Sequence, residues 1–197
     1  HGSSMRCSRF AALLLSWSAA LHAGERPYEM AWANRTQDDH PALVAFTSAD
    51  GWRVETADAE ARLETSTDVL LFGDACAKLT YRATGPHPRI TLVPPAPVAV
   101  TGAFDAVSCW LYGNNHSYAP DPKTPPVQVA LNFADAAGKP FTVNLARVHF
   151  KEWFLCHRRL DAPLIPRVAQ GAMLHSLTVT NGRNAEDRAI YFNSLAV

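Results

Sequence analysis

Apolar and polar residues alternate along most of the chain from about Tyr28 onward, and turns rich in Gly and Pro interrupt this alternation at short intervals. Successive side chains of a β-strand point to opposite faces, so the pattern predicts half-buried strands rather than amphipathic helices. We expect strands over residues 77–83, 89–93, 104–113, 127–135, 141–150, 153–160, 174–181 and 189–197. Short, regularly spaced strands without the helices of a βαβ fold predict an all-β protein, an antiparallel β-sandwich or barrel.

Two segments add detail to this prediction. Residues 53–66 leave two interpretations open, because their Ala and Glu residues favour a helix while the same stretch divides into two short alternating segments. Residues 133–141 predict a hairpin, since a turn containing Gly138 and Pro140 separates two alternating segments. This hairpin would make residues 127–133 and 141–148 antiparallel neighbours, at the opposite end of the sandwich from the loop that begins at Gly113.

The N-terminal residues differ in character from the rest. Residues 1–4, before Met5, resemble the remnant of an expression tag, and Arg6 and Arg9 then precede a short apolar run that ends in small residues. A basic start followed by such a run is typical of a secretory signal peptide, and the run is too short to span a bilayer. The alternative is an amphipathic N-terminal helix. We expect a tag remnant (1–4), a signal peptide (5–23) and a single β-sandwich domain (26–197) in a secreted or periplasmic protein.

Charge and cysteine content narrow the possible partners. The chain has 18 Lys and Arg residues against 18 Asp and Glu residues, a net charge of zero, which argues against nucleic acid as a partner. Outside the predicted signal peptide three cysteines remain without CxxC spacing: Cys76, Cys109 and Cys156. One disulfide with a leftover thiol and three buried thiols are both open, and neither a zinc site nor a redox motif is predicted.

The order of several motifs resembles a known family. The stretches "DGWRVE", "CAKLTYRA", "FDAVSCWLYGNN", "VALNFADAAGKPF", "FKEWFLCHRRL" and "IYFNSLAV" follow one another over residues 51–197. This order is similar to that of the galactose-binding-like jelly-roll carbohydrate-binding modules of secreted bacterial polysaccharide-degrading proteins. The matching positions are Trp110, Tyr112, Gly113, Asn114, Asn115, Asp135, Gly138, Trp153 and Tyr191–Asn193. The resemblance implies an antiparallel jelly-roll sandwich that binds a polysaccharide.

The resemblance also raises the question of a structural calcium ion. Many such modules hold one with an Asp in the last strand, where this chain has Asn193. A neutral amide is a poorer calcium ligand than a carboxylate, so we expect no cofactor. Asp38 and His40, just before Pro41, are interpreted as part of a polar loop rather than a metal or catalytic site.

Alternation divides the strand at 104–113 into two faces. Val107, Cys109 and Leu111 are assigned to the core, whereas Trp110 and Tyr112 lie on the opposite face with Ser108. Aromatic rings beside a hydroxyl form either a sugar platform or part of the buried interior, and both interpretations remain open. The loop that follows offers amide, imidazole and phenol groups suited to sugar hydroxyls. With Trp153 and Arg158 from the next mixed stretch, the candidate ligand-binding residues are Trp110, Tyr112, Asn114, Asn115, His116, Tyr118, Trp153 and Arg158.

No catalytic or metal-binding residue is predicted. The chain has no GxSxG, HExxH, P-loop or GxGxxG motif, although the paired carboxylates of a glycosidase meet only in space. The first hypothesis is therefore a non-catalytic module that binds a polysaccharide or oligosaccharide by aromatic stacking and polar loop contacts. The alternatives are an accessory β-sandwich that packs on a catalytic domain or subunit without binding sugar, and a small polysaccharide lyase or glycoside hydrolase.

Overall fold

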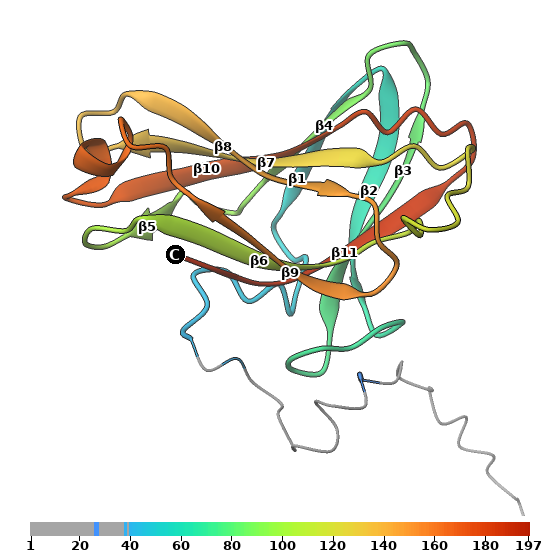
Figure 1. Cartoon of the computed structure of the whole chain (residues 1–197), viewed down its shortest axis with the longest axis horizontal. Coiled ribbons are helices and arrows are strands. Elements are labelled where there is room, and N and C mark those ends of the chain that lie inside the picture. The colour runs from blue at the N-terminus through green and yellow to red at the C-terminus, as the bar shows by residue number, and fades with distance from the viewer. Residues whose placement is uncertain (1–25, 28–37, 39) are drawn as a thin grey trace, which may run out of the picture.

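Two antiparallel sheets pack face to face in the computed structural model, which describes residues 26, 27, 38 and 40–197 (Figure 1). The predicted tag remnant (1–4) and signal peptide (5–23) lie outside these residues. The prediction of an all-β, antiparallel β-sandwich is confirmed. In the part of the chain described, no helix has the length and hydrophobicity that a membrane-spanning helix needs.

Each sheet takes its strands from distant parts of the chain. Sheet A contains, in spatial order, β2 (Ala59–Ser66), β3 (Cys76–Ala83), β11 (Arg188–Ala196), β6 (Ala106–Tyr112) and β9 (Trp153–Arg159). Sheet B contains β1 (Arg53–Ala57), β4 (Arg89–Val93), β10 (Ala172–Thr180), β7 (Val127–Asp135) and β8 (Pro140–Val148), with β5 (Val98–Val100) paired to β10. A 3₁₀ turn, η1 (Ile165–Val168), precedes β10. Strands β8 and β9 therefore end the two sheets on the same side of the sandwich.

The ambiguous segment 53–66 forms strands β1 and β2 rather than a helix. Asp58 joins them with a φ of 51°, and its carboxylate accepts a hydrogen bond from the backbone N–H of His87 at 3.0 Å. From Ala59 onward, alternate residues of β2 face the core, including Leu63. A sheet can bury these alternate positions on one face, so tertiary packing overrides the local helix propensity of Ala and Glu.

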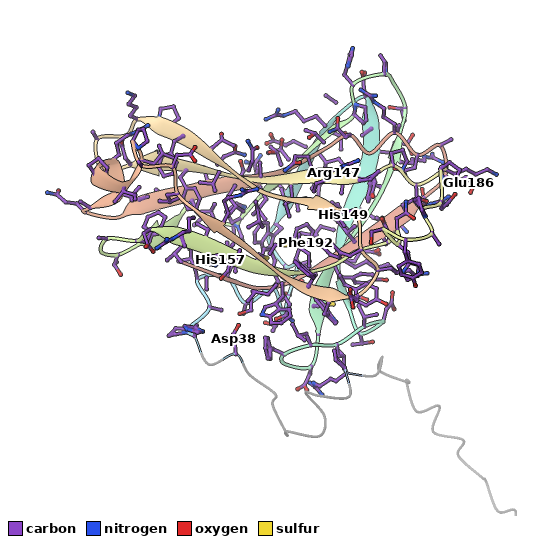
Figure 2. The ribbon with its side chains drawn as sticks, viewed as in Figure 1. Asp38, Arg147, His149, His157, Glu186 and Phe192 are labelled. Carbon is purple, nitrogen blue, oxygen red and sulfur yellow. The ribbon has the colours of Figure 1, made fainter. Side chains whose placement is uncertain are left out.

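The core lies between the sheets and includes the predicted face of β6. Val107, Cys109 and Leu111 are essentially inaccessible to solvent, which confirms their assignment. Sheet B contributes apolar side chains such as Leu131 from its own inner face, and Phe192 of β11 lies between the two layers (Figure 2). Full burial of each such side chain contributes about 1.5–3 kcal/mol to folding.

The predicted hairpin joins β7 to β8, and its antiparallel pairing is confirmed. Phe133 pairs with Phe141, and Gly138 has a φ of 78° in the turn, where a residue without Cβ is favoured. The Asp135 carboxylate accepts hydrogen bonds from backbone N–H groups in the same turn. The β6–β7 loop leads into the start of β7 and the hairpin follows its end, so they occupy opposite ends of the sandwich (Figure 1).

The three cysteines in the described residues are buried free thiols, which decides between the two possibilities that the sequence left open. Burial raises the pKa of Cys76 and Cys156 to about 12 and holds that of Cys109 well above its usual value. Cys109 of β6 lies opposite Cys156 of β9 in the ladder. A thiol with so high a pKa is a poor nucleophile, so these residues behave as packed apolar groups.

Candidate functional site

The structure distributes the eight candidate residues over three places. Trp110, Tyr112 and Trp153 lie on the outer face of sheet A. The β6–β7 loop carries Asn114, Asn115, His116 and Tyr118. Arg158 of β9 lies at the edge of the sandwich beside β8. The eight candidates therefore do not form one continuous surface.

A row of aromatic side chains crosses three strands of sheet A. Tyr112 of β6 pairs with Trp153 of β9 and with Tyr191 of β11, with ring centroids 5.7 and 5.8 Å apart and edge-to-face geometry. The Tyr191 hydroxyl donates to Asp68 at 3.1 Å, and partial burial beside that carboxylate raises the pKa of Tyr191. The rings are half-buried and pack mostly against one another, so this row is chiefly a support for the sheet face.

Beside this row, Trp110 lines a pocket of about 430 Å³ on the outer face of sheet A, here called the Trp110 pocket. The indole is half-buried and packs edge-on against Phe72, with ring centroids 5.9 Å apart. Leu155, opposite Trp110 on β9 and 42% exposed, extends the apolar wall. Polar groups surround the apolar part: Ser108, His157, Asp38 and His40. The pocket thus combines an aromatic ring with a polar rim.

Asp38 lies at this pocket, although 72 residues separate it from Trp110. Its Oδ2 accepts hydrogen bonds from the Trp110 Nε1–H and the Ser194 hydroxyl, each at 3.3 Å, on the outer side of sheet A (Figure 2). Partial burial acts to raise the pKa of Asp38, but the hydrogen bonds, including one from the backbone N–H of His40, outweigh it and hold the pKa below its ordinary value. The pocket therefore contains a fixed carboxylate at neutral pH.

Asp38 also borders a second cavity of about 330 Å³. Phe72, Asn193 and Ser194 line this cavity, which shares Asp38 and His40 with the Trp110 pocket. The Asn193 amide donates to the Phe72 carbonyl at 3.1 Å and is almost fully buried. The Asn193 side chain, whose position raised the question of a calcium ion, is therefore hydrogen-bonded within the protein. The described residues include no group of three or more His, Cys, Asp or Glu side chains arranged to hold a metal ion.

Within the β6–β7 loop, the two asparagines make internal contacts. The Asn115 amide donates to the carbonyls of Asp121 and Thr124, at 3.1 and 2.7 Å, and accepts from the Asp121 N–H at 2.7 Å. The Asn114 amide donates to the hydroxyl of the buried Tyr81 at 2.9 Å. These two side chains therefore fix the shape of the loop, and their amide groups are used in contacts within the protein.

His116 and Tyr118 are the accessible members of the loop. Tyr118 is 82% exposed, and its ring lies 4.9 Å from that of His116. Gly113 opens the loop where any Cβ would lie 2.0 Å from the Phe150 carbonyl oxygen, so only glycine fits. The loop therefore presents a small aromatic surface at one end of the sandwich.

Arg158 lines a separate polar cleft of about 240 Å³ between β8 and β9, here called the Arg158 cleft. Its Nε donates to the Asn144 carbonyl at 3.1 Å, so the side chain lies along the edge of sheet B. Thr142, Asn144, Arg159 and Asp161 contribute further polar groups to the cleft.

Solved structures with a similar architecture include several carbohydrate-binding modules and the enzymatically active domain of a bacteriophage tailspike protein. One, described as the structural basis for the promiscuous specificity of carbohydrate-binding modules from the β-sandwich superfamily, has a TM-score of 0.54 and 11% identity, and the match covers 82% of this chain. The chain spans 62% of that protein's length. The chain therefore shares the β-sandwich fold of that module.

Two further carbohydrate-binding modules match at lower TM-scores. A family 11 module from Clostridium thermocellum, in complex with a β-1,3-1,4-mixed-linked tetrasaccharide, has a TM-score of 0.48 and 8% identity over 78% of this chain and 92% of that chain. A family 61 module in complex with β-1,4-galactotriose has a TM-score of 0.44 and 14% identity over 79% and 97%. No family model matches the chain, and no curated protein matches it significantly. The fold assignment rests on the match with a TM-score of 0.54, and at 11% identity that match shows the fold alone.

Several polar groups on the surface of this β-sandwich were not among the sequence candidates. Asp38, His40 and His157 line the Trp110 pocket, but their convergence depends on contacts between distant segments. On the outer face of sheet B, Thr142, Asn132 and Ser176 form a hydrogen-bonded row across three strands. Alternation along β7 and β8 places Asn132 and Thr142 on the outer face, and this signal could have identified them.

Proposed function

We propose that the protein is a secreted, non-catalytic carbohydrate-binding module that holds a glycan in the Trp110 pocket. The observation that supports this most directly is the composition of the pocket. A volume of about 430 Å³ is within the range of small-ligand sites, which combine apolar walls with a few placed polar groups. Trp110 and Leu155 supply the apolar wall, and Asp38 is the fixed polar group of the rim.

The chemistry of a pyranose ring fits this arrangement. One face of the sugar carries mainly C–H groups and stacks on the Trp110 indole, while its hydroxyls extend sideways toward the rim. The Asp38 carboxylate accepts hydrogen bonds from sugar hydroxyls, and Ser108 and His157 provide further donors and acceptors. Tyr112 and Trp153, in the adjacent aromatic row, stiffen the sheet beneath the bound sugar.

A longer polymer has a second possible contact at the end of the sandwich. The exposed ring of Tyr118 and the half-buried ring of His116 lie together there. Asn114 and Asn115 place these rings through their hydrogen bonds within the loop, so their effect on binding is indirect. In this proposal the protein binds glycan chains at the Trp110 pocket, and the β6–β7 loop adds affinity for extended ligands.

A non-catalytic role agrees with the charges in the Trp110 pocket. Glycoside hydrolysis uses a pair of carboxyl groups, one on each side of the scissile bond. Asp38 is the one acidic side chain among the described residues that line the pocket. Export by the predicted signal peptide (5–23) would bring the module to extracellular or periplasmic glycans, either alone or beside a catalytic domain or subunit.

Affinity electrophoresis tests the proposal. The protein is run through gels containing mixed-linked β-glucan, galactan, xylan or mannan, and we expect at least one neutral polysaccharide to retard it. Trp110→Ala should abolish that retardation, whereas Trp52→Ala should not, because Trp52 packs against Phe46 outside the pocket. Unretarded migration in every gel, or equal retardation of Trp110→Ala, would contradict the proposal.

A further inference from the structure

The edge between β8 and β9 carries features of a binding site that is independent of the Trp110 pocket. The Arg158 cleft lies between β8 and β9, the edge strands of sheet B and sheet A. Its surface is distinct from the outer face of sheet A. Its lining includes two arginines, Arg158 and Arg159, against one acidic side chain, Asp161. Arg159 also lies 3.5 Å from Asp105, whereas Arg158 makes no ion pair among the described residues.

Arg158 is held in position while most of its donors remain available. Its Nε–H donates to the Asn144 carbonyl at 3.1 Å, which uses one of the five N–H groups of the guanidinium. The terminal nitrogens have no hydrogen-bond partner in the described part of the protein. A guanidinium anchored at Nε and open at its two terminal nitrogens matches the geometry of a carboxylate, which it binds through two parallel hydrogen bonds.

A row of polar side chains continues from this cleft across the outer face of sheet B. The Thr142 hydroxyl donates to the Asn132 amide oxygen at 3.0 Å, and the Asn132 amide nitrogen donates to the Ser176 hydroxyl at 3.0 Å. These residues belong to β8, β7 and β10 and are paired in register. Three adjacent strands span roughly 10 Å at the usual strand spacing. Thr142, Asn132 and Ser176 are hereafter called the polar row.

Small side chains flank the polar row on β7. Ala130 and Ala134 occupy the outward positions on either side of Asn132, so the neighbours of the amide along β7 are small. The row presents amide and hydroxyl groups without an aromatic ring. The polar row would recognise a ligand through hydrogen bonds to the hydroxyls of the ligand. The Arg158 cleft, at one end of the row, supplies a guanidinium that can pair with a negatively charged group of the ligand.

We propose that the Arg158 cleft and the polar row form a second glycan site that is selective for sugars bearing a carboxylate, such as uronic acid residues. The carboxylate binds the terminal nitrogens of Arg158, and the hydroxyls of the same and the neighbouring sugar bind the polar row. This inference goes beyond the proposed function, because it concerns another surface and does not require the Trp110 pocket to bind anything.

Isothermal titration calorimetry with acidic oligosaccharides tests this site. The probes are trimers of galacturonate, glucuronate and mannuronate, together with their carboxyl-reduced, neutral counterparts. We expect at least one acidic trimer to bind at least ten times more tightly than its neutral counterpart, because a hydrogen-bonded ionic contact contributes about one to two orders of magnitude. Equal affinities for each acidic and neutral pair, or no binding of any acidic trimer, would overturn the proposal.

Variants locate the effect at Arg158. Arg158→Gln keeps a polar side chain without the charge and should weaken acidic-trimer binding about ten-fold or more, whereas Arg158→Lys, which keeps the charge but loses the paired donors, should be intermediate. The control is Arg183→Gln, which removes a positive charge from an exposed arginine in the β10–β11 loop. An equal loss in Arg183→Gln, or no loss in Arg158→Gln, would overturn the assignment.

The same titrations separate this inference from the proposed function. Trp110→Ala should leave acidic-trimer binding unchanged, and Arg158→Gln should leave neutral-polysaccharide binding unchanged. If Trp110→Ala rather than Arg158→Gln removes acidic-trimer binding, the second site is refuted and the Trp110 pocket accounts for both ligands.

Discussion

Replacing Trp110 by alanine should weaken binding of a neutral oligosaccharide about 20-fold. A fully buried Trp covers 150–250 Å², and stacking on one sugar uses about one third of this, or roughly 70 Å². Trp110 has the rest of its surface in contact with the sheet and Phe72. At about 25 cal/mol per Å² this area corresponds to about 1.8 kcal/mol, which is about 20-fold in Kd.

The assay is calorimetric titration of the wild type and the variants with whichever neutral oligosaccharide binds. Trp110→Phe retains a smaller ring and should lose only about three-fold, by the same area argument. Trp52→Ala is the matched control, since it removes an indole that packs 5.3 Å from Phe46 rather than in the pocket. Circular dichroism checks that each variant is folded at the temperature of the titration.

Two results would refute the reasoning. If Trp110→Ala binds as tightly as the wild type, the indole does not contact the sugar. If Trp52→Ala loses as much affinity as Trp110→Ala, the loss reflects a general disturbance of the sandwich rather than a missing stacking surface.

Three other predictions concern stability and thiol chemistry. Hydrogen bonds hold the pKa of Asp38 below its usual 3.8, against the opposing effect of burial, so its stabilisation is present above about pH 4 and lost as the pH falls through the folded pKa. At pH 6 the melting temperature of Asp38→Ala should be about 2–4 °C below that of the wild type, after allowance for solvent screening of this partly exposed group. Near pH 2 the two proteins should melt at the same temperature. A difference that persists at pH 2 would contradict this. Asn115→Ala should lower the free energy of unfolding by about 3 kcal/mol in a urea titration, because three hydrogen bonds in the loop are lost, and a change below about 1 kcal/mol would show that they are not formed. In the native state at pH 8 an alkylating reagent should label none of the three buried thiols, Cys76, Cys109 and Cys156, because their pKa values are raised. Peptide mapping that finds label on any of them would contradict this.

Most strands could be predicted because alternation is a local property of the sequence. The core face of β6 follows directly from the alternate positions of Val107, Cys109 and Leu111. Residues 53–66 could not be assigned, because their helix propensity and their alternation point to different structures. Packing of their alternate residues against the opposite sheet favours the strands, and this packing is not visible in the local sequence. The hairpin at Gly138 was predictable because its turn chemistry is local as well.

The arrangement of the site depends on contacts that local patterns do not contain. Asp38 reaches Trp110 across 72 residues, and this contact requires Asp38 itself to lie on the outer face of sheet A. Alternation places Arg158 on the opposite side of its strand from Trp153, but its contact with the Asn144 carbonyl of β8 depends on how the edges of the two sheets meet. Buried amides such as Asn115 look the same in sequence as exposed ones, because the difference lies in their tertiary hydrogen bonds.

The central claim, that a neutral glycan binds on the Trp110 pocket of sheet A, is tested most directly by NMR of the indole N–H signals during titration with an oligosaccharide. Trp110 Nε1–H donates to Asp38 at the pocket rim, so its signal should shift most as the sugar binds. The signal of Trp52 should shift little, since that ring packs against Phe46 away from the pocket. An oligosaccharide that binds without moving the Trp110 signal would contradict the account.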